Sequence, residues 1–117
     1  MNISGMGNIA IGNGSLYLNT TGSNNIAVGR DVMYSNTEGY DNVAVGKYSM
    51  YSNINGNYNT AIGNGSLFYN ITGIYNIAIG YEPLLNNTYG YNNLAIGYQT
   101  LYNNKTGCYN VSIGSIS

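Results

Sequence analysis

Glycine recurs at every seventeenth position along almost the whole chain, and no insertion or deletion interrupts the interval. The first series is Gly12, Gly29, Gly46, Gly63, Gly80, Gly97 and Gly114. A second series with the same step is Gly5, Gly22, Gly39, Gly56, Gly73, Gly90 and Gly107. A constant period of this length is the signature of a repeat architecture. The chain must therefore fold as one small unit stacked on itself.

The repeated unit reads G-x-x-N-x-A-[IV]-G-x-x-x-[LM]-[YFL]-x-N-x-x. Helical repeats need roughly 33 residues or more, so this unit is too short for a pair of helices. It can hold one coil of a β-solenoid, with a first strand at N-x-A-[IV]-G and a second at [LM]-[YFL]. The sequence predicts an all-β fold, a parallel β-roll of seven 17-residue coils. We expect residues 1–117 to form one repeat domain, with full repeats over 5–106 and a partial repeat over 107–117.

Alternation along the first strand places the aliphatic residues on one face and the small residue on the other. We expect the aliphatic face, together with the [LM] position, to fill a thin interior. The predicted core residues are Ile26, Val28, Met33, Val43, Val45, Met50, Ile62, Leu67, Ile77, Ile79, Leu84, Leu94, Ile96 and Leu101.

Asparagine also keeps the period, and stacked amides can bond along a solenoid as they do in cross-β structures. The predicted ladders are Asn25, Asn42, Asn59, Asn76 and Asn93, and also Asn36, Asn53, Asn70, Asn87 and Asn104. Glycine suits turn positions with positive φ. The predicted turn glycines are Gly22, Gly29, Gly39, Gly46, Gly56, Gly63, Gly73, Gly80, Gly90 and Gly97.

The small position of the strand is the predicted contact between chains. Its members are Ala10, Ala27, Ala44, Ala61, Ala78 and Ala95. Because the predicted core is too lean to order 17 residues per coil at roughly 1.5 kcal/mol each, we expect further burial in a homo-oligomer.

Composition argues against most chemistry. Charged residues make up 6% of the chain, the net charge is −1, and there is no histidine. We therefore expect no nucleic-acid binding, which needs a basic face, and no enzyme, because a general acid–base pair has few candidates. No metal or other cofactor is expected, and Cys108 is an incidental thiol. Without a run of about 18 apolar residues, no membrane insertion is expected. No signal peptide is visible at the start.

Seven short segments, one per repeat, resemble the head repeats of trimeric autotransporter adhesins, the YadA-like heads. They read GNIAIG, NNIAVG, DNVAVG, YNTAIG, YNIAIG, NNLAIG and YNVSIG. The longer GYNNLAIGYQTLYNN is similar to repeats of phage and other viral tail-fibre proteins. The resemblance implies a left-handed parallel β-roll, a homotrimer, and a role in surface attachment. The adhesin head repeat is usually shorter, so the [LM]-[YFL]-x-N segment adds a larger turn here.

Two functions remain open at this point. One is a structural repeat module of a trimeric fibre, on a virion or an extracellular surface, with itself and a cell-surface receptor or carbohydrate as partners. The other is a self-assembling subunit of an extracellular filament that stacks end to end through unpaired strand edges. The chain would then be either part of a longer fibre or a polymerising subunit.

Overall fold

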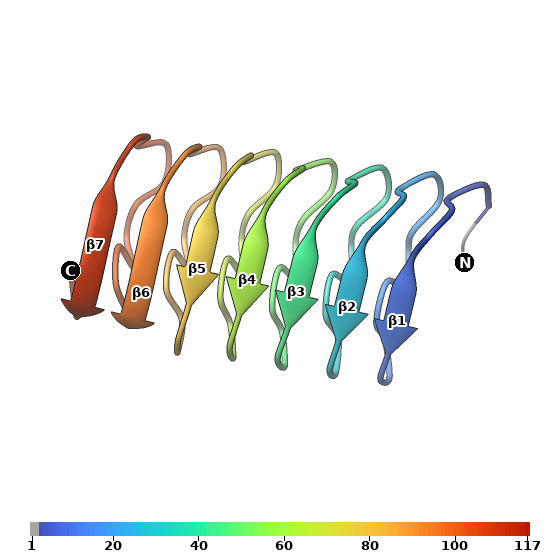
Figure 1. Ribbon diagram of the computed structural model, residues 1–117, viewed down its shortest axis with the longest axis horizontal. Coiled ribbons are helices and arrows are strands. Elements are labelled where there is room, and N and C mark those ends of the chain that lie inside the picture. Colours follow the sequence, from blue (N-terminus) through green and yellow to red (C-terminus); the bar gives the residue numbers. More distant parts are fainter. Residues whose placement is uncertain (1–2) are drawn as a thin grey trace.

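The computed structural model describes residues 3–117, and in them seven parallel strands form a single sheet in chain order (Figure 1). The strands are β1 Ile9–Ile11, β2 Ile26–Val28, β3 Val43–Val45, β4 Thr60–Ile62, β5 Ile77–Ile79, β6 Leu94–Tyr98 and β7 Val111–Ser115. Each residue pairs with its equivalent one repeat later, as Ala44 pairs with Ala61. The predicted all-β parallel solenoid is confirmed.

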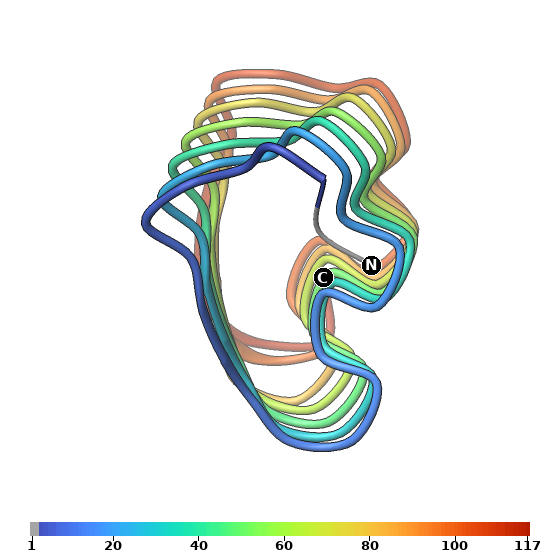
Figure 2. The same cartoon turned by 90° about the vertical axis from the view of Figure 1, so that its right-hand side faces the viewer.

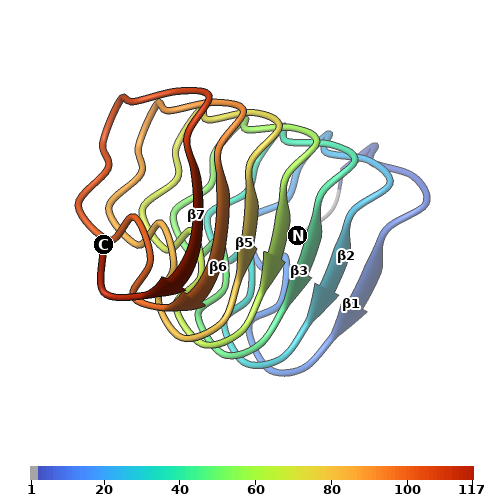
Figure 3. The ribbon, with the colours of Figure 1, turned by 60° about the vertical axis from the view of Figure 1, so that its left-hand side comes forward.

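The coils stack into a short rod whose principal extents are 38 × 22 × 17 Å. Figure 2 looks along the rod from its N-terminal end, with the strands on one long side and the opposite side folded inward. In this view the chain runs counterclockwise as it recedes, so the coil is left-handed, as the resemblance implied. Figure 3 shows the sheet as one continuous side of the rod.

The second predicted strand, at [LM]-[YFL], is not a strand but part of a turn. Its first residue adopts a left-handed conformation in every coil, with φ between 49° and 51°. The members of this column are Leu16, Met33, Met50, Leu67, Leu84 and Leu101. A hydrogen bond from the N–H of Asn36 to the carbonyl of Met33 (3.2 Å) closes the turn. The turn folds this segment inward and buries the Leu or Met side chain.

A left-handed conformation costs a residue with a side chain roughly 1–2 kcal/mol. Each coil offsets this cost through the next coil, because the N–H of Met33 bonds the carbonyl of Ser49 (3.0 Å) and that of Met50 bonds Ser66 (2.9 Å). Full burial of such a side chain contributes about 1.5–3 kcal/mol, and Met33 and Met50 are fully buried. The strained turn is therefore stable only in the stack.

The interior contains the small residue of each strand, and this reverses the prediction. Ala27, Ala44, Ala61, Ala78 and Ala95 are completely buried within the single chain. They pack in one cluster with the column of Leu and Met side chains. The small column is therefore part of the core and not a contact between chains; Ala10, in the first coil, has the same orientation but is exposed.

The core prediction was right for the [LM] column and wrong for the strand aliphatics. Met33, Met50, Leu67 and Leu84 are fully buried, and Leu101 packs against them. The residues that point outward instead, half-buried or exposed, are Ile26, Val28, Val43, Val45, Ile62, Ile77, Ile79, Leu94 and Ile96. The cause is space. The inward-folded turn brings Leu and Met against the strand, and the remaining gap accepts no side chain larger than alanine.

Ala61→Leu is expected to lower the free energy of unfolding by about 1–3 kcal/mol, because it forces extra carbon into a filled interior. Thr60→Leu is the matched control. Thr60 is the neighbouring residue, points outward, and its column already contains Leu94. The control should change stability by less than about 0.5 kcal/mol. Urea denaturation of both variants gives the comparison, and equal losses would mean that the strand is facing the other way.

Candidate functional site

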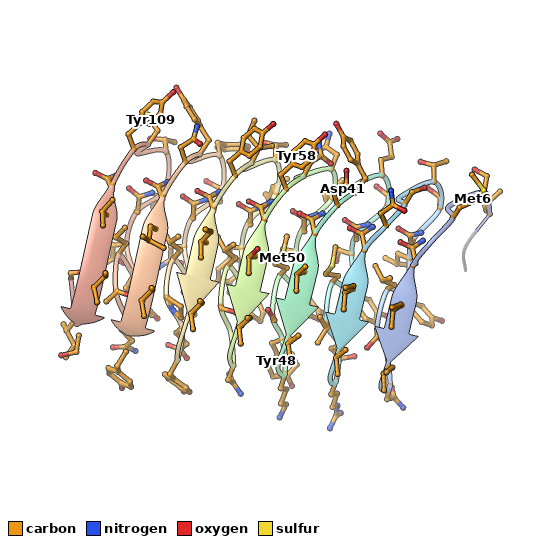
Figure 4. All side chains as sticks on the ribbon, viewed as in Figure 1. Met6, Asp41, Tyr48, Met50, Tyr58 and Tyr109 are labelled. Carbon is orange, nitrogen blue, oxygen red and sulfur yellow. The ribbon has the colours of Figure 1, made fainter. Side chains whose placement is uncertain are left out.

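The outer face of the sheet is a regular surface that runs along one side of the rod. Two columns of side chains point outward from the strands, as Figure 4 shows. The first column is Ile9, Ile26, Val43, Thr60, Ile77, Leu94 and Val111, and the second is Ile11, Val28, Val45, Ile62, Ile79, Ile96 and Ile113. We call these fourteen residues the aliphatic face. Thirteen of them are aliphatic, and none is charged.

The aliphatic face is open to solvent in the single chain: six of its residues are exposed and eight are half-buried. Ile77 is 41% exposed and Ile62 is 39% exposed in the middle of the rod. Seven strands about 4.8 Å apart, each three residues of about 3.3 Å, cover on the order of 300 Å². Contiguous apolar patches of this size on a single chain are often interaction sites. The face can therefore bind another apolar surface.

One asparagine ladder runs beside the first residue of each strand. Asn42 Nδ2 donates to Asn25 Oδ1 (3.1 Å) and to the carbonyl of Gly56 (2.8 Å). The backbone N–H of Asn42 donates to the same Asn25 Oδ1 (3.1 Å). Every polar atom of the side chain is therefore used, as a buried amide requires. The predicted ladder of Asn25, Asn42, Asn59, Asn76 and Asn93 is confirmed, and it extends to Asn8 and Asn110.

The second predicted ladder lies where the inward-folded turn ends. Asn53 Nδ2 donates to Asn36 Oδ1 (2.7 Å) and to the carbonyl of Gly56 (3.1 Å). The same pattern joins Asn36, Asn53, Asn70, Asn87 and Asn104, and it begins at Asn19. The carbonyl of Gly56 thus accepts from both ladders. This shared carbonyl ties the strand side of the coil to the turn side.

The shared carbonyl explains the second glycine series. A Cβ built on Gly56 would lie 2.6 Å from the carbonyl oxygen of Gly73 and 2.7 Å from Asn70 Nδ2. No positive φ is recorded at Gly22, Gly39, Gly56, Gly73 or Gly90, so the expected reason for these glycines was wrong. Positive φ belongs to the other series, as at Gly63 (φ 122°). The second series is required by close approach of the ladders.

Aromatic side chains continue the stacking on the turn side of the rod. Tyr17, Tyr34, Tyr51 and Phe68 form an unbroken stack, with centroids 5.1, 5.3 and 5.1 Å apart. These spacings follow the repeat and lie within the 4.5–7 Å range of favourable ring pairs. A second, separate pair is Tyr58 and Tyr75, 4.9 Å apart. Tyr40 raises the pKa of Tyr58, chiefly through a hydrogen bond between the two hydroxyls.

Charged side chains are scarce in this protein. Arg30 Nε lies 3.5 Å from Asp31 Oδ2, and this is the ion pair found within residues 3–117. In the same part of the chain, no group of three or more His, Cys, Asp or Glu residues could hold a metal ion. No helix in that range has the length and apolarity to span a membrane. The site is therefore one of packing and hydrogen bonding.

Sequence reasoning found both ladders but not the aliphatic face. It also missed the left-handed turn positions, of which one column contains Asp31, Tyr48, Glu82 and Gln99 with φ from 50° to 62°. The sequence did contain a signal for positive φ in that column, because glycine stands there at Gly14 and Gly65.

No protein-family model, curated protein or solved structure matches the chain.

Asn59→Ala is expected to lower the free energy of unfolding by about 3 kcal/mol, since it leaves buried polar groups unpaired. The backbone N–H of Asn76 loses its acceptor, and the carbonyl of Gly73 loses one of its two donors. Asn64→Ala, at an exposed position outside the ladders, serves as control and should be within about 0.5 kcal/mol of wild type. Thermal or urea unfolding measures both. Similar stability of the two variants would contradict a structural role for the ladder.

Proposed function

We propose that the chain is a structural repeat module of a homotrimeric surface fibre, in which the aliphatic face packs against its copies. The observation that carries the proposal is this face itself: thirteen aliphatic side chains in two straight columns, with no charge among them. Burial of apolar surface is the main driving force of association. A copy of the same chain fits best, because it has the same rise per coil and its columns stay in register along the rod.

The proposed number of chains, three, comes from the resemblance to trimeric adhesin heads. A flat strip on one side of each rod is compatible with a bundle around a common axis, where every chain contributes its aliphatic face. The ladders and the Ala–Leu–Met core are complete within one chain. The module therefore supplies stiffness by itself, and assembly adds thickness and hides the apolar face.

A fibre of this kind acts by length and surface and not by catalysis. We place it on an extracellular surface or a virion, with attachment as its role and a cell-surface receptor or carbohydrate as its further partner. The turns, which differ from coil to coil in side chain, remain outside such a bundle. They supply the surface that a receptor would contact.

The double variant Ile62→Glu/Ile79→Glu is expected to convert the trimer into monomers, because it places two unpaired carboxylates in an apolar interface. Analytical ultracentrifugation should give about three times 12.5 kDa for the wild type and a single chain mass for the variant. Circular dichroism should show that the variant keeps its β-structure, because both side chains point away from the core.

Ile54→Glu is the matched control, since Ile54 is 43% exposed but lies on a turn away from the sheet. This control should remain a trimer. A monomeric wild type would refute assembly through the face, and a stable dimer would refute the number three. Filaments that lengthen with concentration would favour end-to-end stacking instead.

A further inference from the structure

A hollow of about 240 Å³ is lined by residues of the turns and by no strand residue. Its lining includes Tyr48, Phe68, Tyr69, Tyr102 and Glu82. The volume is below the roughly 300 Å³ at which pockets for drug-sized ligands begin. The hollow therefore suits a single small chemical group, such as the end of a side chain or a lipid head group.

The hollow exists because one repeat position lacks a side chain. Gly65 stands in the column that contains Tyr48 one coil before it and Glu82 one coil after it. A Cβ on Gly65 would meet Glu82 Cγ at 3.1 Å and Leu85 Cδ1 at 3.8 Å. The missing side chain leaves a gap in this column, and Tyr48 and Glu82 are among the residues that line it.

The walls of the gap are aromatic and stand at steep angles to one another. The rings of Tyr48 and Phe68 are 6.0 Å apart at 69°, and those of Phe68 and Tyr69 are 4.6 Å apart at 63°. Rings at these angles border one small volume in different planes. Ring faces carry negative partial charge and attract cations. Lys47 Nζ already lies over the ring of Tyr48, 4.8 Å from its centroid.

The carboxylate of Glu82 is held in place by neutral groups. Gln99 Nε2 donates to Glu82 Oε2 (3.1 Å). The same carboxylate raises the pKa of Tyr81, chiefly by accepting a hydrogen bond from its hydroxyl. Within residues 3–117, Glu82 forms no ion pair. Its negative charge is thus oriented but not neutralised, and an anionic ligand would be repelled.

From these features we infer that the hollow around Gly65 is an aromatic cage that binds a methylated ammonium group. Four aromatic rings surround the alkyl groups of such a ligand, and the carboxylate of Glu82 balances its charge. Aromatic cages are the usual binding site of quaternary ammonium ligands. The group can come from a choline head group or from a trimethylated lysine side chain, which share this chemistry. The inference stands apart from assembly through the aliphatic face.

Choline chloride is the probe, and 3,3-dimethylbutan-1-ol is its neutral control of the same shape. Saturation-transfer NMR should show the N-methyl protons of choline in contact with the protein, and calorimetry should give the Kd. We expect the neutral alcohol to bind about tenfold more weakly or worse, since it lacks the charge. Phosphocholine and Nε-trimethyl-lysine then distinguish the two sources by their relative Kd values.

Three variants locate the binding. Gly65→Gln fills the hollow with a residue that the same column accepts at Gln99, and it should abolish binding while the fold persists. Glu82→Gln should weaken choline binding about fivefold and leave the binding of the alcohol unchanged. Tyr34→Leu is the control and should bind choline as the wild type does. Tyr34 belongs to the same aromatic stack as Phe68 but does not line the hollow.

Retained β-structure by circular dichroism shows that each variant is folded. Equal binding of choline and the neutral alcohol would overturn the inference, and so would full choline binding by a folded Gly65→Gln variant. Absence of any choline contact at millimolar concentration would also overturn it. If the wild type proves to be a monomer, assembly through the aliphatic face is refuted, but these choline-binding outcomes keep their meaning.

Discussion

The structure depends on one repeated interaction: a glycine carbonyl that accepts hydrogen bonds from both asparagine ladders. At Gly56 it joins Asn42, beside the strand, to Asn53, at the end of the turn. The two halves of the coil are therefore held at one fixed distance in every repeat. Buried amides are costly unless all their hydrogen bonds are made. Making them needs a neighbour in register on both sides, which is why the seventeen-residue spacing admits no insertion.

That fixed distance determines which residues face inward. The ladder and the inward-folded turn leave a narrow interior that Met50 and its equivalents fill, and the strand can add no more than the methyl group of Ala44 or Ala61. The larger residues on either side, such as Val45 and Ile62, must then point out. An apolar outer face follows from the polar ladder, because a narrow coil cannot bury its own aliphatic residues. The association that we propose would remove this face from water.

The sequence was sufficient for the period, the parallel solenoid and both ladders, since each depends only on spacing. It was not sufficient for the faces of the strand. Alternation separates Ala61 from Ile62 but does not say which points inward, and the usual preference for burying the larger residue gave the wrong answer. The turn at Met50 was also misassigned, because β propensity suggests a strand where contacts between coils impose a left-handed residue. Both errors concern packing across the coil, which no single repeat records.

Variation between coils is confined to positions that the ladders do not use. Asn and Gly are constant where amides and carbonyls meet, whereas the turn column that includes Asp31, Tyr48, Gly65 and Glu82 changes in every coil. A side chain there faces solvent and its equivalents one coil away, so it can change without disturbing the stack. Specific chemistry in such a rod must therefore arise from differences within one column. Gly65 is such a difference: a residue removed from a column creates a hollow whose walls are its neighbours.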